Sequence, residues 1–181
     1  ENGDAAKAPK PRSETFSDAF GREIVDLART DPRIVAISAA MTTGTGLKEF
    51  AGRFPDRFYD VGIAEGHAVT MAAAMALYGL RPVVAIYSTF LQRGFDSIVV
   101  DVALQNAPVI FAVDRAGLVG ADGPTHHGTF DLAFMRSIPN LTIMVPRDQV
   151  MLGAMLREAL TLSGPVAIRY PRDRVVKRPL S

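Results

Sequence analysis

Short runs of apolar, mostly β-branched residues recur along the chain, and they constrain its fold more than any other feature. Longer segments with helical spacing separate them. Short apolar strands that alternate with helices are typical of a parallel sheet covered on both faces. The strand candidates are "RIVAIS" (33–38), "RFYDV" (57–61), "PVVAIY" (82–87), "PVIFAV" (108–113), "LTIMVP" (141–146) and "PVAIRY" (165–170).

Between these runs we expect the helices that cover the sheet. The first helix would span about 16–30, with Ser13 or Ser17 as its N-cap. The later helices would begin near Glu65 and cover 93–106 and 149–162. With right-handed crossovers, this order predicts an α/β fold: an open, mostly parallel sheet with helices on both faces. The order of the strands is left open.

Composition excludes several classes of protein. A formal net charge of +1 over 181 residues argues against a nucleic-acid partner or an acidic membrane surface. The chain has no cysteine, which excludes disulfides, thiolate zinc sites and cysteine nucleophiles. No apolar run approaches the roughly 18–20 residues of a transmembrane helix. We therefore expect a cytoplasmic protein with no membrane partner.

The two ends of the chain differ in character from its body. Residues 1–14, "ENGDAAKAPKPRSE", are polar and proline-containing, and 174–181 are basic without periodicity. Both ends are typical of connections between domains. We expect a linker over 1–14, one domain over 15–173, and a second linker over 174–181 that leads to a further, C-terminal domain.

Four segments rich in glycine and polar residues directly follow strand candidates. Ligands of open parallel sheets bind beyond the carboxyl ends of the strands, so these segments are expected to meet at one edge. All three histidines of the protein, His67, His126 and His127, lie in them. The segments are "AAMTTGTG" (39–46), "GIAEGH" (62–67), "YSTFLQR" (87–93) and "DRAGLVGADGPTHHG" (114–128).

Glu65 and His67 stand at the start of a helix that is otherwise apolar on all sides. Glu65 has two interpretations. A first-turn glutamate is favourable beside the positive end of the helix dipole. A helix this apolar is buried, however, and a buried carboxylate is costly unless a partner needs it. For His67, a structural role is the simpler interpretation.

The third and fourth loops add aromatic and cationic side chains. Phe90 belongs either to the core or to an aromatic platform beside Arg93. Arg115 and Arg169 each follow a strand, either as surface residues or as a clamp for a phosphate or carboxylate. In the glycine-rich loop, adjacent histidines rarely both face one ion and no spaced partner follows, so no metal site is expected. Acid–base work on a small polar substrate fits Asp122 and His126 better.

Taken together, the segments "AAMTTGTGL", "FYDVGIAEGHAVT", "VVAIYSTFLQRGFD", "DVALQNAPVIFAVDRAGLVGADGPTHHGTFDL" and "IPNLTIMVPRD" resemble one family. That family is the central, pyrimidine-binding domain of 1-deoxy-D-xylulose-5-phosphate synthase, a thiamine-diphosphate transferase of the transketolase superfamily. The resemblance implies that Glu65 hydrogen-bonds the aminopyrimidine ring of thiamine diphosphate, and that this contact allows the ring to remove the thiazolium proton. It also implies that Phe90 stacks on that ring, with Met41 and Arg93 close to the cofactor.

The resemblance further implies a reaction and its participants. Pyruvate would be decarboxylated and its two-carbon unit joined to glyceraldehyde 3-phosphate, giving 1-deoxyxylulose 5-phosphate for isoprenoid, thiamine and pyridoxal phosphate synthesis. Glu65, Asp122 and His126 would be catalytic. Tyr87, Arg115 and Arg169 would bind the phosphate of the aldehyde. Members of the family form homodimers, so a dimer is expected here too.

Two departures from the family pattern qualify these implications. Gly66 stands where the family usually has glutamine, and glycine in a helix costs up to about 1 kcal/mol. The second departure is larger: the "GDG" segment and following asparagine that bind magnesium and the diphosphate are not in this sequence, and "GADG" at 120–123 lacks the asparagine. We therefore expect the chain to be inactive without a diphosphate-binding domain, supplied in cis or in trans.

Two other functions stay open. The chain could be a non-catalytic binding or assembly module of the same fold, or the β-type subunit of a split thiamine enzyme such as a 2-oxo acid dehydrogenase. "YSTFLQR" and "DRAGLVGADGPTHHG" favour the synthase over the β-type subunit. Glu65, Asp122, His126 and the arginines favour catalysis over an assembly module.

Overall fold

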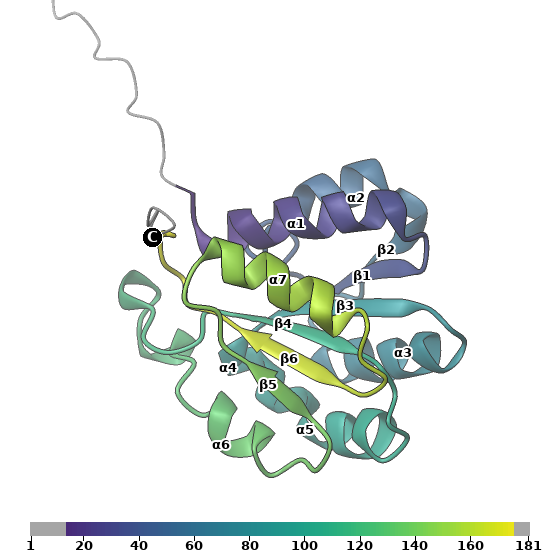
Figure 1. The fold of residues 1–181 in the computed structure, drawn as a ribbon. Helices are drawn as coiled ribbons and strands as arrows, with labels where there is room; N and C mark the ends of the chain where they lie inside the picture. The colour runs from purple at the N-terminus through teal and green to yellow at the C-terminus, as the bar shows by residue number, and fades with distance from the viewer. Residues whose placement is uncertain (1–13, 176–181) are drawn as a thin grey trace, which may run out of the picture.

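A computed structural model describes residues 14–175, in which six strands form one sheet in the order β2-β1-β3-β4-β6-β5 (Figure 1). Every neighbouring pair of these strands is parallel. The expected class, an open parallel α/β sheet, is confirmed. The strands are β1 (Ile34–Ser38), β2 (Phe58–Asp60), β3 (Arg81–Tyr87), β4 (Ile110–Asp114), β5 (Thr142–Met144) and β6 (Val166–Arg169).

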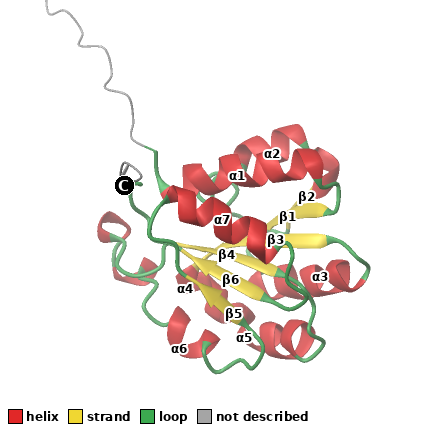
Figure 2. Ribbon diagram, viewed as in Figure 1, coloured by secondary structure: helices red, strands yellow, loops and turns green. Residues whose placement is uncertain are grey.

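Helices cover both faces of the sheet, as Figures 1 and 2 show. On one face, α1 (Phe16–Thr30), α2 (Lys48–Arg53) and α7 (Gln149–Ala159) enclose a core that includes Phe20 and Phe50. On the other, α3 (Glu65–Leu77) and the segment after β3 pack on residues such as Phe111. Short elements complete the fold: η1 (Pro55–Arg57), α4 (Ser88–Leu91), η2 (Gln92–Gly94), α5 (Phe95–Ser97), η3 (Ile98–Ala103), η4 (Gly120–Asp122), η5 (Pro124–His126) and α6 (Asp131–Met135).

The start of α1 differs from the expectation. Its N-cap is Thr15, whose hydroxyl accepts the Asp18 N–H while the Asp18 carboxylate accepts the Thr15 N–H. This reciprocal pair is a capping box, which satisfies two backbone donors at once. Ser17 lies inside the helix, so its prediction as N-cap was wrong, and Ser13 lies outside the described residues.

The helix expected over 93–106 begins earlier and is not regular. Helical residues start at Ser88, directly after β3, and the segment changes from α to 3₁₀, back to α and then to π geometry by Ala103. Gly94 lies against α3, where a Cβ would stand 3.0 Å from the Val69 side chain. The early start places Phe90 within one turn, and Arg93 within two turns, of the end of β3.

The topology also fixes where a ligand crevice can form. From β1 the chain passes outward to β2, and then returns to β3 on the opposite side of β1. Such a reversal opens a crevice beyond the carboxyl ends of the two inner strands. The loops after β1 and β3 therefore border it, with the loop after β4 next in line.

The two ends of the described chain lie together. Thr15 pairs with Arg174 in an antiparallel bridge, and the Val175 N–H donates to the Glu14 carbonyl at 2.9 Å. Val175 is buried against the α1 core. Glu14 and Val175, which lie just outside the expected domain limits of 15–173, are therefore in contact with each other, and Val175 packs on the core. The limits themselves stay a prediction. No helix within 14–175 has the length and apolar character needed to cross a bilayer.

Candidate active site

Glu65 is the first residue of α3 and is 4% exposed. Its Oε1 accepts a hydrogen bond from Arg93 Nη1, and the two side chains form an ion pair. Ala64, the N-cap, offers no side-chain cap, so the carboxylate also lies near free N–H groups at the positive end of the helix. Within 14–175 no other hydrogen bond reaches this carboxylate. A buried charge with one free oxygen is suited to a polar ligand.

Gly66, the departure from the family pattern, leaves this geometry intact. An added Cβ would meet only the Arg93 carbonyl and the Ser97 hydroxyl, each at 3.9 Å, which is ordinary contact. Alanine there would reduce the entropy of the unfolded chain without strain, worth roughly 0.4–1 kcal/mol. We expect Gly66→Ala to raise the melting temperature of the chain by about 1–4 °C in calorimetry. A lower melting temperature would show that the glycine is required by the helix start.

Aromatic and cationic side chains form a continuous row beside Glu65. Tyr87 and Phe90 stack with their centroids 5.6 Å apart and 22° between their planes. His126 meets Phe90 edge-on at 5.4 Å, and the Arg93 guanidinium lies 5.1 Å from the same ring. At the far end, the Arg115 guanidinium lies 3.6 Å from the Tyr87 centroid. Cation–π contacts and stacking therefore link predicted residues of two loops, and the ion pair between Arg93 and Glu65 joins a third.

Gly44, in the loop after β1, makes room for this row. A Cβ at Gly44 would stand 1.7 Å from the Tyr87 hydroxyl, so only glycine allows the ring to lie there. Its carbonyl accepts a hydrogen bond from Arg115 Nη1 at 3.0 Å. Burial raises the pKa of Tyr87 above its ordinary value, although the Arg115 charge opposes the shift. The phenol is therefore neutral and can donate to a ligand.

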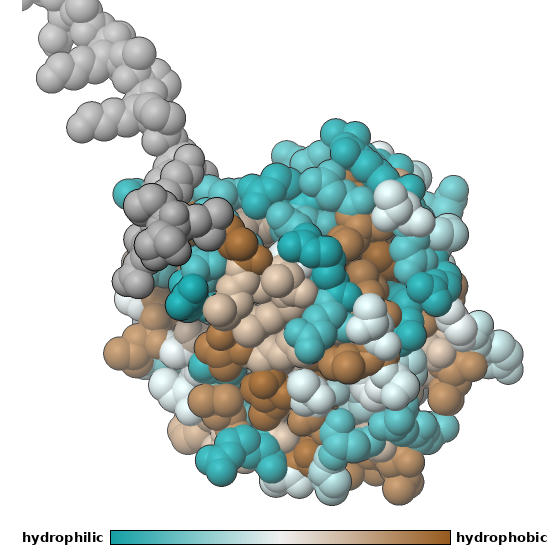
Figure 3. Space-filling model, in the orientation of Figure 1, coloured by the Kyte–Doolittle hydropathy of each residue, from teal (hydrophilic) through white to brown (hydrophobic). Residues whose placement is uncertain are grey.

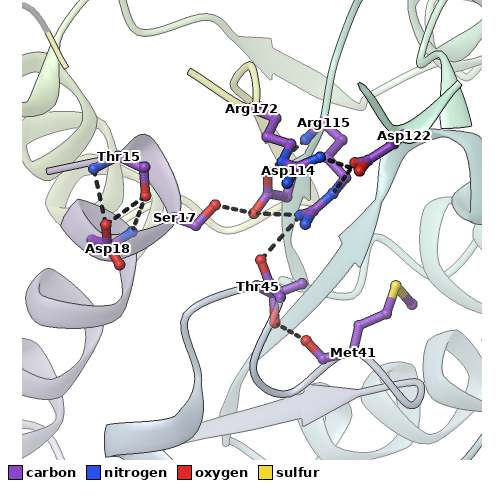
Figure 4. A network of polar contacts seen from close by, with 10 residues as sticks. Thr15, Ser17, Asp18, Met41, Thr45, Asp114, Arg115, Asp122 and Arg172 are labelled. Atoms are coloured by element: carbon purple, nitrogen blue, oxygen red, sulfur yellow. Dashed lines mark hydrogen bonds and ion pairs between the residues drawn. The ribbon is translucent and has the colours of Figure 1, made fainter. Parts of the chain in front are cut away.

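Asp122 lies between two arginines. Its carboxylate accepts from Arg115 Nε at 3.4 Å and forms an ion pair with Arg172 (Figure 4). Partial burial opposes ionisation, but the hydrogen bonds and charges of Arg172 and Arg115 outweigh it and lower the pKa of Asp122. The carboxylate is thus ionised at neutral pH. Sequence reasoning missed Arg172, although its position just after β6 is a signal for this edge.

Asp114, the last residue of β4, was also missed. It is fully buried, and its carboxylate accepts from the Ser17 hydroxyl and from the Arg115 N–H, each at 2.6 Å (Figure 4). Burial raises the pKa of Asp114 to about 6, even though the Ser17 hydrogen bond and the Arg115 charge act in the opposite direction. The charged form of this residue therefore costs folding free energy at neutral pH.

This shift predicts a pH dependence of stability. Because the folded-state pKa lies above the unfolded value of 3.8, stability from the neutral Asp114 is complete below about pH 4 and is lost as the pH rises through about 6. Wild type loses this stability between about pH 4 and pH 6, whereas Asp114→Asn has no such group to ionise. The unfolding free energy of Asp114→Asn minus that of wild type should therefore rise by up to about 3 kcal/mol over this pH range. Urea unfolding from pH 4 to 7 measures the difference. A constant difference across this range would contradict the shift.

A closed loop carries Asp122 and His126. Gly117 and Gly128 exchange backbone hydrogen bonds, both at 2.8 Å, at the neck of this loop. Inside it, the Val119 N–H donates to His127 Nδ1 at 3.2 Å. His127 is thus engaged within the loop, whereas His126 reaches Phe90. The backbone hydrogen bonds at the neck of the loop therefore help to set the positions of these side chains.

Met41 and Arg169 are less closely joined to this row. Met41 is buried in the core on the α3 side of the sheet, and its N–H donates to the Ser38 hydroxyl at 3.0 Å. Arg169, at the end of β6, donates two hydrogen bonds to the buried Asp131, at 2.9 and 3.2 Å. Its guanidinium is therefore held by a carboxylate, and its role toward a substrate stays a prediction.

The structure thus brings seven of the predicted residues into one connected group. Cofactor, substrate and catalytic roles for them stay predictions. No set of three histidine or acidic side chains within 14–175 is arranged to hold a metal ion. The members are Glu65, Tyr87, Phe90, Arg93, Arg115, Asp122 and His126.

Comparison with known proteins supports the fold and the family. The chain is 64% identical over 174 residues to the 1-deoxy-D-xylulose-5-phosphate synthase of Carboxydothermus hydrogenoformans, covering 96% of this chain and 28% of that protein. It is 62% identical over 163 residues to the synthase of the same name from Syntrophomonas wolfei, covering 90% of this chain and 26% of that protein. The chain therefore spans about a quarter of the length of these curated relatives.

Solved structures give the same fold. A split-gene transketolase, in an inactive β4 tetramer, matches with a TM-score of 0.81 at 31% identity, over 94% of this chain and 55% of that one. The transketolase of Campylobacter jejuni matches with a TM-score of 0.83 at 23% identity, over 99% of this chain and 30% of that one. A family model, "Transketolase, pyrimidine binding domain", matches residues 13–177. The chain belongs to the family of transketolase pyrimidine-binding domains.

Proposed function

We propose that this chain is the pyrimidine-binding part of a thiamine-diphosphate-dependent 1-deoxy-D-xylulose-5-phosphate synthase. The reaction would join the two-carbon unit of pyruvate to glyceraldehyde 3-phosphate for isoprenoid, thiamine and pyridoxal phosphate synthesis. The names of the curated relatives support this choice. The observation that carries it is the buried Glu65 carboxylate, with one oxygen free of protein donors within 14–175, beside the partly exposed Phe90 ring.

The residues present fit the pyrimidine end of the cofactor. A flat ring can stack on Phe90 while Glu65 accepts a hydrogen bond from a ring nitrogen, which stabilises the protonated ring in a site with little water. Arg93 holds the carboxylate in place through an ion pair. When bound, thiamine diphosphate supplies the electron sink for decarboxylation. No metal ligands gather within the described residues, so the diphosphate and its Mg²⁺ are assigned to another domain.

The remaining side chains are assigned to substrate. Asp122 and His126 lie on the closed loop next to Phe90, where they can exchange protons with reacting oxygens. The Tyr87 hydroxyl and the Arg115 guanidinium would bind the phosphate of the aldehyde, with Arg169 as a further donor. Arg172 joins this set, since it pairs with Asp122 Oδ1 while Arg115 Nε pairs with Oδ2 (Figure 4).

The surface supports a partner domain at the same edge. Large apolar side chains that follow the strand ends are exposed: Ile63 by 81%, Leu118 by 76% and Phe130 by 68%. Exposed apolar residues at a ligand edge mark a contact surface. Hydrophobic residues also gather on the face over α7 and β6 (Figure 3). We propose that a diphosphate-binding domain, in cis or in trans, covers the site, and that the enzyme is a cytoplasmic homodimer.

Reconstitution tests this proposal. The chain is fused to, or mixed with, a diphosphate-binding domain of a homologous synthase, and product is measured with pyruvate, glyceraldehyde 3-phosphate, thiamine diphosphate and Mg²⁺. We expect product only when both parts are present. The inactive tetramer of the split-gene transketolase is a precedent for the inactive half. No product in any arrangement would favour the assembly module instead.

A further inference from the structure

Asp114 has no exposed surface, and both of its oxygens are engaged. Oδ2 accepts from the Ser17 hydroxyl at 2.6 Å, and Oδ1 accepts from the Arg115 N–H at 2.6 Å. Arg115 Nη1 lies 3.6 Å from Oδ2. The carboxylate therefore contacts α1 on one side and both the backbone and the side chain of Arg115 on the other.

Arg115 needs this support because its backbone is strained. Its φ of +59° is in the left-handed region, which costs a residue with a Cβ roughly 1–2 kcal/mol. The hydrogen bond from its N–H to Asp114 holds that conformation. The side chain then places its guanidinium over the Tyr87 ring and donates to the Gly44 carbonyl. One carboxylate thus controls both the turn and the direction of the arginine.

The fold gains little from the charge of Asp114. Asparagine has the same shape, its oxygen can accept the Arg115 N–H, and its amide can donate to the Ser17 hydroxyl. Only the contact with the arginine side chain would be lost, because the amide would present a donor to Nη1. Since the buried charge of Asp114 lowers stability, its contact with the Arg115 side chain is the best explanation for it.

We propose that Asp114 and Ser17 are positioning residues, which hold the Arg115 guanidinium in place to bind the phosphate monoester of the aldehyde substrate. The identity of the ligand rests on the proposed function. The positioning itself rests only on the contacts of Arg115.

Two variants and a matched control test the inference. Asp114→Asn and Ser17→Ala are compared with Asp26→Asn, an exposed aspartate of α1. Calorimetric titration of the 181-residue chain with glycerol 3-phosphate, and with glycerol as the uncharged control, measures phosphate binding. We expect Asp114→Asn to weaken phosphate binding by about tenfold, through loss of the ion pair that directs the Arg115 guanidinium. Ser17→Ala should give a smaller loss, and Asp26→Asn none.

In the reconstituted enzyme, Asp114→Asn should raise the KM for glyceraldehyde 3-phosphate about tenfold and leave kcat within about twofold. Its melting temperature at pH 7 should be no lower than that of wild type. Three results would overturn the inference. Phosphate binding could be unchanged in Asp114→Asn, it could be absent in wild type, or a loss of binding in Asp114→Asn could be accompanied by a fall in its melting temperature. Wild-type chain that binds glycerol 3-phosphate but forms no product when reconstituted would reject the proposed function and leave the positioning intact.

Discussion

Replacing Gly128 with alanine should lower the melting temperature of the chain by roughly 6–12 °C. An added Cβ would stand 2.4 Å from the Arg115 carbonyl oxygen and 2.4 Å from the Ser88 hydroxyl. Neither atom can retreat, because Ser88 is buried at the start of α4 and Arg115 is held by Asp114. Overpacking of this kind costs about 3 kcal/mol, which corresponds to the stated shift. Calorimetry of the purified chain measures it.

Gly52→Ala is the matched control. Gly52 lies in α2, where nothing stands within 4 Å of an added Cβ, so alanine should stabilise the helix by roughly 0.5–1 kcal/mol. Opposite signs for the two substitutions would show that contacts at the loop neck, rather than loss of glycine itself, cause the effect. Equal and small shifts for both would mean that the neck of the loop can move aside.

The second large effect concerns Glu65. In the reconstituted enzyme, Glu65→Gln should reduce product formation by about 10²–10⁴-fold, as expected for loss of a group that takes part in proton transfer. Glutamine keeps the volume of the side chain and can still accept from Arg93, so the folded structure should persist. Initial rates measured beside the melting temperature of the variant separate chemistry from stability. A fall of less than tenfold would show that the carboxylate charge is not needed.

Arg93→Lys is the matching test of the Glu65 partner. Lysine keeps the charge but lacks the planar guanidinium that meets both Glu65 and the Phe90 ring. An intermediate loss of rate is expected, smaller than that of Glu65→Gln. A loss as large as that of Glu65→Gln would place Arg93 itself in the chemistry.

Much of the fold follows from local pattern. Each apolar run predicted as a strand contains one. The side chains of β1, β3, β4 and β6 are almost all buried, as short apolar runs in a covered sheet predict, whereas the edge strands β2 and β5 are partly exposed. The ligand edge followed in turn from the rule that loops after parallel strands meet. Glu65, Phe90 and Asp122 were found in this way, and Tyr87 came from the family resemblance. The structure places all four in one connected group.

What was missed depends on contacts between distant residues. Ser17 meets Asp114 across 97 positions, so no local pattern links them. Arg169 is the last residue of β6 and Arg172 stands three residues further on. Only the position of Asp131 decides that Arg169 is held by a buried carboxylate. The N-cap at Thr15 is a different case, because its signal is local. Asp18, at the third helical position, completes a capping box with Thr15.

Exchange of the thiazolium C2 proton tests the central claim most directly. The claim is that the buried Glu65 carboxylate acts on the pyrimidine ring of thiamine diphosphate. The reconstituted enzyme is mixed with thiamine diphosphate and Mg²⁺ in deuterated water without substrates, and loss of the C2 proton signal is followed by NMR after acid quench. The account predicts exchange at least about 100-fold faster with wild type than with Glu65→Gln. Equal exchange rates in the two enzymes would contradict it.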